Sequence, residues 1–464
     1  MTGVHERVDC AVVGGGMSGM AAALTAAEHG CSVLLLEKSD RPGGSAAISG
    51  GLVWTDPTFE DLRARMPGGD PELGRALVEG YEDAVAWLCR QGVEMTERLT
   101  GLFGTGVGRR VGDMPRAVEL LRTRLEQAGG RIVCGARATE LECDGNGRVA
   151  GVAATTADGT LRVPAGAVIL CTGGFQADRD LVAEHIGADP DNLVVRAAPH
   201  STGDGLRLAL SAGAALSEGM DAFYGHLMPA PPARVPPERI LFLTQYYSHH
   251  CVLLNREGRR FVDESAADEV STQALARQPG SEGFLVLDAV AAEHVGDPVA
   301  AGFPPVDRHA ELQAAGGRVY PAEDLDGLER VLEEAGADGA AGRRELEAYN
   351  AVIADGRNPD VPRRHRRRPL AQPPYLVVPV VPGITFTEGG IGIDVDGRAL
   401  GADGRPVPGL YAAGADGGHV FFEHYAGGLA LSLVFGRRAG AHAATHVATA
   451  AAENPGGAAR VAPC

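Results

Sequence analysis

The stretch VDCAVVGGGMSG, residues 8–19, decides the fold of this chain. An apolar strand ends there in the pattern Gly-x-Gly-x-x-Gly, formed by Gly14, Gly16 and Gly19, and the Ala-rich segment 20–30 that follows has the composition of a helix. The first glycine of such a turn permits a tight bend, the second lets backbone approach a pyrophosphate, and the third lets helix pack closely on strand. The helix N-terminus then offers its N–H groups to the phosphates.

A second apolar run, residues 32–36, delivers Glu37 twenty-three positions after Gly14. Glycines in a turn would be a weak signal alone, but strand, helix, second strand and acid are all present at the spacing of a dinucleotide-binding unit. The Glu37 carboxylate is placed to accept hydrogen bonds from ribose hydroxyls. The sequence therefore predicts an α/β protein with a Rossmann-like domain that binds a dinucleotide.

Composition narrows the function classes. The chain has 464 residues and a net charge of −18, which argues against nucleic acid or an anionic membrane as a partner. Residues 1–7 have no apolar signal core and no run reaches the length of a membrane span, so we expect a cytoplasmic protein. The eight cysteines form no C-x-x-C pair, so we expect no metal centre and reduced thiols.

The chain is long enough for two domains, and its composition changes twice. We expect residues 1–222 to form the first part of the cofactor domain, residues 223–370 an inserted domain, and residues 371–464 the second part, with a disordered tail from about residue 453. Within the first part, residues 131–134, 138–144 and 149–156 predict a small antiparallel sheet, and residues 167–171 a buried strand.

Motifs outside the opening stretch point to one family. After Glu37 come Lys38, RPGGS at 41–45 and SGG at 49–51, and far downstream TGGF at 172–175 and GLYAAG at 409–414. Together, and in this order along nearly the whole chain, they resemble the FAD-binding subunits of the fumarate reductase and succinate dehydrogenase superfamily. The resemblance implies FAD as cofactor, held in a discontinuous Rossmann-like domain with an inserted α+β capping or substrate domain.

Three further motifs resemble the soluble, single-chain members of that superfamily. They are NREGRRFVDE at 255–264, PGITFTEGG at 382–390 and HYAGG at 424–428. The similarity is to tricarballylate dehydrogenases and, more distantly, to 3-ketosteroid dehydrogenases.

The resemblance implies specific cofactor contacts. Ser45 would face the flavin ring edge, the backbone near Arg137 would touch adenine, and Asp416, where the family usually carries Glu, would lie near the ribitol. Covalent members carry a His after the Gly-Gly; residues 46–48 are Ala-Ala-Ile here, so we expect non-covalent FAD. The full set of implied cofactor-binding residues is Gly14, Gly16, Met17, Ser18, Gly19, Glu37, Lys38, Gly43, Gly44, Ser45, Ser49, Gly50, Gly51, Arg137, Ala138, Cys171, Thr172, Gly173, Gly174, Asp204, Gly414, Asp416, Gly427, Gly428 and Leu431.

The chain departs from the fumarate reductases where these carry cationic and polar substrate groups. Asp268 stands where the family places a proton-delivering Arg, Tyr425 replaces a second Arg, and Phe386 replaces a His. Three such roles are lost together, so we do not expect fumarate reduction.

The candidate groups that are left after these replacements suit a reaction at the carbon atoms next to a carbonyl. We expect FAD-dependent desaturation of a C–C bond beside a carbonyl or carboxyl group of a small molecule, with hydride transfer to flavin N5. Tyr425, with the Gly428 N–H, is similar to the Tyr/Gly arrangement of the ketosteroid enzymes and is the candidate donor to the developing oxyanion. The candidate bases precede the 255–264 motif: Tyr246, Tyr247, His249 and His250.

Several alternatives stay open at this point. The same geometry run backwards is an ene-reductase, and a flavin-binding protein without turnover is a third hypothesis. His249 and His250 could be a strand-edge pair, and Tyr246 and Tyr247 could simply pack. The basic run 363–368 is either a solvated hinge face or a surface that steers an anionic substrate. The electron acceptor is left open.

Overall fold

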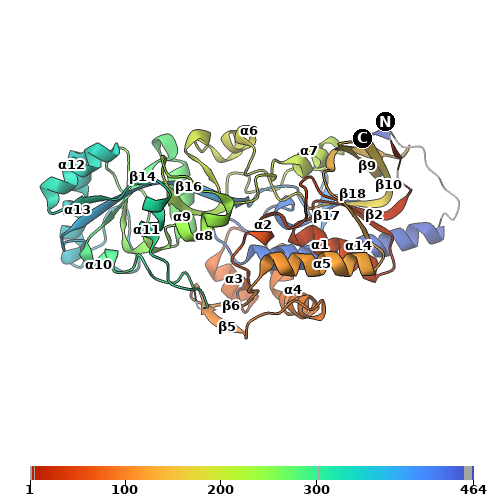
Figure 1. Ribbon diagram of the computed structural model, residues 1–464, viewed down its shortest axis with the longest axis horizontal. Coiled ribbons are helices and arrows are strands. Elements are labelled where there is room, and N and C mark those ends of the chain that lie inside the picture. The colour runs from red at the N-terminus through yellow and green to blue at the C-terminus, as the bar shows by residue number, and fades with distance from the viewer. Residues whose placement is uncertain (1–2, 5, 301, 454–461) are drawn as a thin grey trace. The chain divides into compact units, whose positions relative to one another are not determined.

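The computed structural model describes residues 3–4, 6–300, 302–453 and 462–464 (Figure 1). The described chain forms two units: the first comprises residues 1–178, 197–222 and 386–464, and the second residues 179–196 and 223–385. The sequence-based boundaries at 222 and 370 did not include the short segment 179–196. That segment joins the second unit because its strand β11 (Val194–Val195) pairs with β16 (Tyr375–Thr387).

The first unit is built on a parallel sheet whose central strand is β2. The strand order is β7-β3-β2-β10-β18, with every neighbouring pair parallel. Cys10, Ala11 and Val12 in β2 are fully buried, as the apolar opening stretch predicted. The strands are β2 (Val8–Val13), β3 (Val33–Leu36), β7 (Arg131–Val133), β10 (Gly159–Leu170) and β18 (Pro406–Ala412).

An antiparallel extension continues this sheet from the first half of β10. It runs through β9 and β8 to β19, and β1 and β17 pair at other edges of the sheet. The expectation that residues 131–134 belong to the antiparallel sheet is wrong, because β7 pairs parallel to β3. The strands of the extension are β8 (Arg137–Cys143), β9 (Val149–Thr156) and β19 (Ala462–Pro463), and the two other edge strands are β1 (Gly3–Val4) and β17 (Arg398–Leu400).

The end of the chain differs from the sequence-based expectation. Residues 454–461 of the expected disordered tail lie outside the described residues, but β19 pairs with β8 and Cys464 forms a disulfide with Cys143. The expectation of reduced cysteines is therefore wrong for this pair, whereas Cys10, Cys31, Cys89, Cys134, Cys171 and Cys251 are free thiols.

Helices of the first unit pack beside the parallel sheet, with α1 against α14 (Figure 1). The two helices approach closely because Gly436 and Gly440 present no side chain: a Cβ on either would lie 2.4 Å from a backbone oxygen of α1. A separate three-stranded sheet, in the order β4-β6-β5, carries Trp54. The remaining elements of this unit are α1 (Met17–Glu28), α2 (Gly44–Ala47), β4 (Leu52–Thr55), α3 (Phe59–Arg65), α4 (Pro71–Arg90), β5 (Leu99–Leu102), β6 (Gly106–Arg110), α5 (Met114–Gln127), α7 (Asp204–Ser211) and α14 (Gly428–Glu453).

The second unit is a six-stranded sheet covered on both faces. Alternate residues of β13 point to opposite faces: Val252 and Leu254 join a core with α12 and α13, and Leu253 joins a core with α9 and α11. The elements are α6 (Arg179–Leu181), β12 (Phe223–Pro229), α8 (Ile240–Leu243), β13 (Val252–Asn255), α9 (Asp268–Ala276), β14 (Gly283–Leu287), α10 (Ala289–Ala292), α11 (Arg308–Ala314), β15 (Tyr320–Ala322), α12 (Leu325–Ala335) and α13 (Gly339–Ala354), with β11 and β16.

Among the described residues, no helix has the length and hydropathy that crossing a membrane would require. The cytoplasmic location stays a prediction.

The basic run 363–368 is not a uniformly solvated face. Arg363 is only 1% exposed, and its guanidinium binds the Glu264 carboxylate and the backbone oxygens of His249 and Cys251. Arg260 donates to both oxygens of the same carboxylate and shares Oε2 with Arg363. One buried acid thus holds two buried arginines, and Arg363 is a structural residue of the second unit.

Arg363→Ala should lower the free energy of unfolding by about 3 to 5 kcal/mol, because the buried negative charge of Glu264 would then keep only one of its two arginine partners. The matched control is Arg364→Ala, whose side chain is 71% exposed and which should change stability by no more than about 0.5 kcal/mol. Urea unfolding followed by circular dichroism measures both. Equal midpoints for the two variants would contradict the structural role of Arg363.

Candidate functional site

Four loops meet at one edge of the parallel sheet. Because β2, β3, β10 and β18 run in the same direction, the residues that follow their carboxyl ends lie side by side at that edge. These residues are Gly14–Gly16, Glu37–Lys38, Cys171–Gly174 and Ala413–Asp416. The motifs quoted from distant parts of the sequence thus form one site in the first unit.

The three fingerprint glycines have three different surroundings. Gly14 has φ +102°, and a Cβ on it would lie 2.2 Å from the backbone oxygen of Cys171, while a Cβ on Gly19 would lie 1.9 Å from the backbone oxygen of Gly14. A Cβ on Gly16 would meet no described protein atom within 4 Å. Gly14 and Gly19 therefore serve the packing of strand on helix, and Gly16 borders open space.

The N-terminus of α1 faces that open space. Gly16 is its N-cap residue, and among the described residues no side chain caps the helix by a hydrogen bond. The first N–H groups of a helix need partners, and the helix dipole favours a negative one. This cradle fits the pyrophosphate of a dinucleotide, with Met17 and Ser18 in the first turn.

Glu37 is held by the chain itself. Its carboxylate accepts the Gly15 N–H at 2.7 Å and the N–H and hydroxyl of Ser39 at 2.7 and 2.8 Å. These bonds fix the carboxylate at the end of β3 beside the glycine turn. The ribose contact predicted for Glu37 stays a prediction, and Gly15 and Ser39 are partners that the sequence did not suggest.

Asp204 is the centre of an ion cluster. Lys38 Nζ lies 2.9 Å from Asp204 Oδ2, and the Arg137 guanidinium donates to both oxygens of Asp204 at 2.8 and 3.1 Å. The two cations hold the pKa of the Asp204 carboxyl below its usual range against the effect of burial. Three predicted cofactor-binding residues are thus brought together, joining β3, β8 and α7.

The glycine-rich segment 41–51 is attached to the fingerprint turn. The Gly43 N–H donates to the Gly15 oxygen, and the short helix α2 begins after Gly43, whose φ is +134°. The Ser45 hydroxyl accepts the Ala198 N–H at 3.0 Å, and the Ser49 hydroxyl bonds the Ala46 oxygen. These bonds position Gly44 against Gly16, where the predicted flavin-edge contact would form.

Asp416 joins the loops that follow β10 and β18. Its buried carboxylate accepts the N–H of Thr172, the Thr172 hydroxyl and the Gly174 N–H. Burial raises the pKa of this carboxyl, and the hydrogen bonds oppose that rise. The residue predicted to lie near the ribitol therefore also organises the Thr172–Gly174 turn.

Tyr425 and Gly428 meet at the start of α14. The Gly428 N–H donates to the Tyr425 hydroxyl oxygen at 2.8 Å. The Tyr425 ring lies among those of Trp54, Phe386 and Phe421, at centroid distances of 5.5, 6.0 and 5.7 Å. The structure thus joins the two groups of the predicted oxyanion site, but it directs the Gly428 N–H at Tyr425.

The candidate bases Tyr246 and Tyr247 differ sharply. The Tyr247 hydroxyl lies 2.6 Å from Gln245 Oε1 and 2.9 Å from His309 Nε2, and burial raises the pKa of this phenol well above its usual value. Tyr246 is half-buried and accepts a hydrogen bond from the Arg196 guanidinium at 2.8 Å. Tyr247 is therefore the poorer base of the two.

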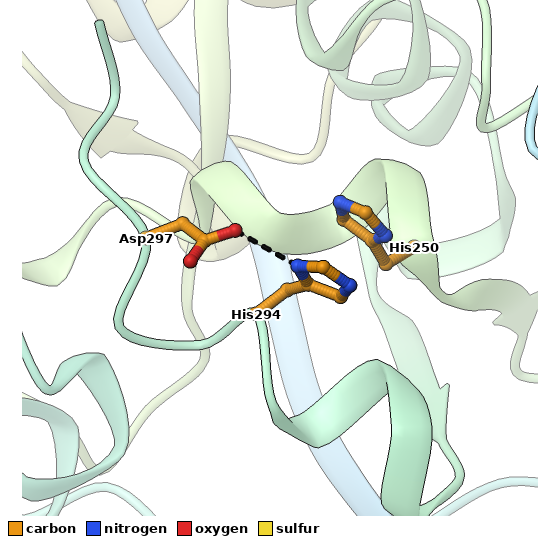
Figure 2. A group of neighbouring side chains, drawn as sticks. All are labelled: His250, His294 and Asp297. Carbon is orange, nitrogen blue, oxygen red and sulfur yellow. Dashed lines mark hydrogen bonds and ion pairs between the residues drawn. The ribbon is translucent and has the colours of Figure 1, made fainter. Parts of the chain in front are cut away.

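His249 lies beside His250, with 4.3 Å between the ring centroids, and His250 in turn stacks on His294. Figure 2 shows His250 with His294 and Asp297. The rings of His250 and His294 stack at 3.7 Å with 12° between their planes, and His294 Nδ1 lies 2.8 Å from Asp297 Oδ2. Burial and neighbouring positive charge lower the pKa of His249 to about 4 and that of His250 to about 3. Both are neutral near pH 7 and weak bases.

These side chains could offer three ligand atoms, from His250, His294 and Asp297, within 4.8 Å of one another. Imidazole lone pairs lie in the ring plane, so two stacked, nearly parallel rings hold them in separate parallel planes instead of directing them at one ion. The geometry is that of packing, and Arg366 adds positive charge beside it.

Sequence reasoning missed a polar network around β12. His226 bonds Asp268 through Nδ1 at 2.5 Å and Tyr224 through Nε2 at 2.6 Å. Arg196, which is buried, donates to the hydroxyls of Thr244, Thr385 and Tyr246. A sequence signal did exist, since Tyr224 and His226 stand two apart in an otherwise apolar strand and therefore share a face.

A parallel sheet with a glycine-cradled helix N-terminus, and a second unit inserted in the chain, define a two-unit flavoprotein of the dinucleotide-binding class. Comparison with known proteins agrees. The FAD binding domain family matches residues 9–428, and the chain belongs to this family.

Two relatives and one solved structure illustrate the similarity. Fumarate reductase (cytochrome) of Shewanella frigidimarina is 30% identical over 479 residues, covering 95% of this chain and 78% of the relative. Urocanate reductase of Eggerthella lenta is 30% identical over 471 residues, covering 95% and 75%. The fold is similar to that of 3-ketosteroid-Δ4-(5α)-dehydrogenase from Rhodococcus jostii RHA1, with a TM-score of 0.74, 24% identity, and coverage of 94% of this chain and 97% of that one.

The predicted superfamily, fold class and FAD cofactor are confirmed. So is the enzyme class, an FAD-dependent oxidoreductase acting on CH–CH groups. The individual cofactor contacts and catalytic residues stay predictions.

Gly16→Val should abolish FAD binding while the protein stays folded, because the added side chain enters the space in front of α1 and meets no described protein atom. Gly112→Val is the matched control, since its Cβ also meets no described protein atom, and it should bind FAD fully. Flavin absorbance per protein and circular dichroism measure the two effects. Full flavin occupancy in Gly16→Val would contradict the placement of the pyrophosphate.

Proposed function

We propose that this enzyme desaturates a C–C bond next to a carbonyl or carboxyl group of a small molecule whose body is largely apolar. Bound FAD supplies a hydride acceptor at N5. The chain's own task is then to bind the substrate, to stabilise negative charge on its oxygen and to take the proton from the carbon beside the carbonyl. Fumarate and urocanate, the substrates named for the two relatives, each carry a C=C bond next to a carboxyl group. They support a reaction at a C–C bond in that position.

The pair Tyr425 and Gly428 is the observation that carries the proposal. Since the phenol oxygen accepts the Gly428 N–H, its O–H bond is polarised and becomes a stronger donor. Gly428 is also the first residue of α14, whose N-terminal dipole favours nearby negative charge. A carbonyl oxygen that gains charge as the neighbouring proton leaves would be stabilised by this donor.

The surroundings of Tyr425 support an apolar substrate. Trp54 is 2% exposed, and it lies with Phe386 and Phe421 around the phenol ring. Phe386 and Tyr425 stand where fumarate reductases carry cationic or polar groups for carboxylates. Aromatic side chains would remove water from a carboxylate and give it neither hydrogen bonds nor an opposite charge in return. A ketone or a monoacid with an apolar body therefore fits this site better than a dicarboxylate.

FAD is proposed to be bound without a covalent link. Ala46, Ala47 and Ile48 stand in and just after the short helix α2 (Gly44–Ala47), where covalent members of the superfamily carry a His, and none of these three side chains can attack the flavin. Acid precipitation of the holoprotein should therefore release all of its flavin into the supernatant.

An anaerobic titration of the holoprotein should identify the substrate class. We expect cyclohexanone or 3-phenylpropanoate to bleach the oxidised flavin bands, and succinate and tricarballylate to leave them unchanged, because the aromatic wall disfavours multiple carboxylates. If the saturated compounds fail but 2-cyclohexen-1-one or cinnamate reoxidises the photoreduced protein, the physiological direction is reduction. No response to any member would favour a flavoprotein without turnover.

Tyr425→Phe should slow the reaction of bound flavin with the active compound by about 100- to 1000-fold, the cost of losing one oxyanion donor, while FAD occupancy stays full. Tyr411→Phe is the control: it removes another buried hydroxyl of the same unit, which bonds His442. Stopped-flow flavin absorbance gives the rates. An unchanged rate in Tyr425→Phe would remove the oxyanion role.

A further inference from the structure

The tip of the β5–β6 hairpin carries an aromatic residue in an unfavourable backbone conformation (Figure 1). Leu102 and Gly106 are paired across the two strands, so the loop between them has three residues. Phe103 is the first of the three, and its φ is +49°. Glycine and asparagine enter this left-handed region readily, whereas a bulky side chain is strained there. The turn by itself therefore favours another residue type at position 103.

The same residue is largely in contact with solvent. Among the large apolar side chains of the described residues, Phe103 has the highest exposed fraction, 47%. A single exposed apolar side chain is common on protein surfaces. Strain and exposure at one position are not, and a residue that departs from the local preference in this way is expected where its side chain has a function.

Phe103 belongs to the aromatic group that surrounds Tyr425. Its ring packs on that of Trp54, with 4.8 Å between the centroids and 46° between the planes. The hairpin lies directly on the indole, since a Cβ on Gly106 would be 2.8 Å from a carbon of the Trp54 ring. Trp54 is 2% exposed, and its other aromatic contact is with Tyr425, at 5.5 Å. Phe103 is therefore the solvent-facing end of this group.

A buried ion pair holds the hairpin tip in place. The Asp56 carboxylate is fully buried and accepts two hydrogen bonds from the Arg65 guanidinium, at 2.9 and 3.0 Å. Arg65 also donates to the Phe103 backbone oxygen at 3.1 Å and to the Thr105 hydroxyl at 3.2 Å. The Thr105 hydroxyl donates to Asp56 at 2.8 Å. The strained residue is thus held through its backbone, and the exposed part of its ring keeps a fixed position.

We propose that Phe103 is a substrate-binding residue whose exposed ring stacks on an aryl group of the substrate. The preferred substrates are then acids or ketones that carry an aryl group beyond the C–C bond that reacts. This inference rests on the proposed function, because it takes the substrate oxygen to be bound by Tyr425. Trp54 contacts both rings, so Phe103 and Tyr425 stand one side chain apart, and both belong to the first unit.

Stacking makes the inference specific for an aromatic ring. Two aromatic rings attract each other in offset or edge-to-face arrangements by more than the area that they bury. A cyclohexyl group lacks this attraction, although it has slightly more apolar surface to bury. Burial alone therefore predicts that a cyclohexyl compound binds at least as tightly as the matching phenyl compound, whereas stacking on Phe103 predicts the opposite order.

Binding to the oxidised holoprotein tests this order without turnover. The probes are cinnamate and (E)-3-cyclohexylacrylate, which share the unsaturated acid and differ in the ring. Both are already desaturated, so neither can give a hydride to the flavin. Isothermal titration calorimetry measures the two dissociation constants. We expect the wild-type protein to bind cinnamate about 3- to 10-fold more tightly, the ratio that corresponds to one aromatic contact.

Substitution of Phe103 should change this preference and leave the fold intact. Phe103→Leu and Phe103→Asn should abolish it, since neither has a ring and asparagine also suits the turn, while Phe103→Tyr should keep it. Leu216→Ala is the matched control, because it shortens another exposed side chain of the first unit and should leave both constants unchanged. Circular dichroism and flavin absorbance measure folding and FAD occupancy of each variant.

The outcomes separate this inference from the proposed function. If the wild-type protein shows no preference for cinnamate, or binds neither probe, the role of Phe103 is overturned, and flavin bleaching by cyclohexanone still decides the reaction. A preference that persists in Phe103→Leu and Phe103→Asn overturns it as well. If the preference depends on Phe103 but 3-phenylpropanoate does not bleach the flavin and cinnamate does not reoxidise the photoreduced protein, the aryl contact stands and the proposed reaction fails.

Discussion

The close approach of backbone at Gly14 is the constraint on which the rest of this structure depends. A Cβ at Gly14 or Gly19 would lie within about 2 Å of a backbone oxygen, so β2, α1 and the residue after β10 can meet only through glycine. That contact sets the end of β2 beside the ends of β3 and β10. The Asp416 carboxylate then ties in the loop after β18 through Thr172 and Gly174. Backbone contacts at glycine therefore bring the strand ends together, and side-chain hydrogen bonds hold the loops at the cofactor-binding edge.

Charge is distributed differently in the two units. In the first unit, the Asp204 cluster and Asp416 use their hydrogen bonds to hold loops together, and the open N-terminus of α1 is left for an anionic ligand. In the second unit, Arg363 and Arg260 are both paired with the buried Glu264 carboxylate, whereas the hydrogen bonds of Arg196 to described residues go to hydroxyls. The same residue type thus serves as a structural tie in one place and as a source of electrostatic potential in another.

The aromatic residues around Tyr425 carry the proposed preference for an apolar substrate. Phe386 and Tyr425 form part of an aromatic wall, which suits a substrate that is activated by one oxygen. In the second unit, His226 bonds Asp268 at 2.5 Å and Tyr224 at 2.6 Å.

The sequence by itself determined what depends on neighbouring residues. The turn after β2, the helix α1 and the position of Glu37 follow from glycine spacing and apolar runs within about forty residues, so a dinucleotide-binding domain could be predicted from them. The resemblance of motifs spread over nearly the whole chain then indicated FAD and the superfamily. Tertiary structure decided what depends on distant partners: the parallel pairing of β7, the burial of Arg363, the Cys143–Cys464 disulfide across 321 residues, and the meeting of His226 with Asp268. No local pattern encodes these contacts, because burial and partner choice are properties of the packed chain. Tyr224 and His226 were visible as polar residues on one strand face, but only packing against α9 gives them an acid.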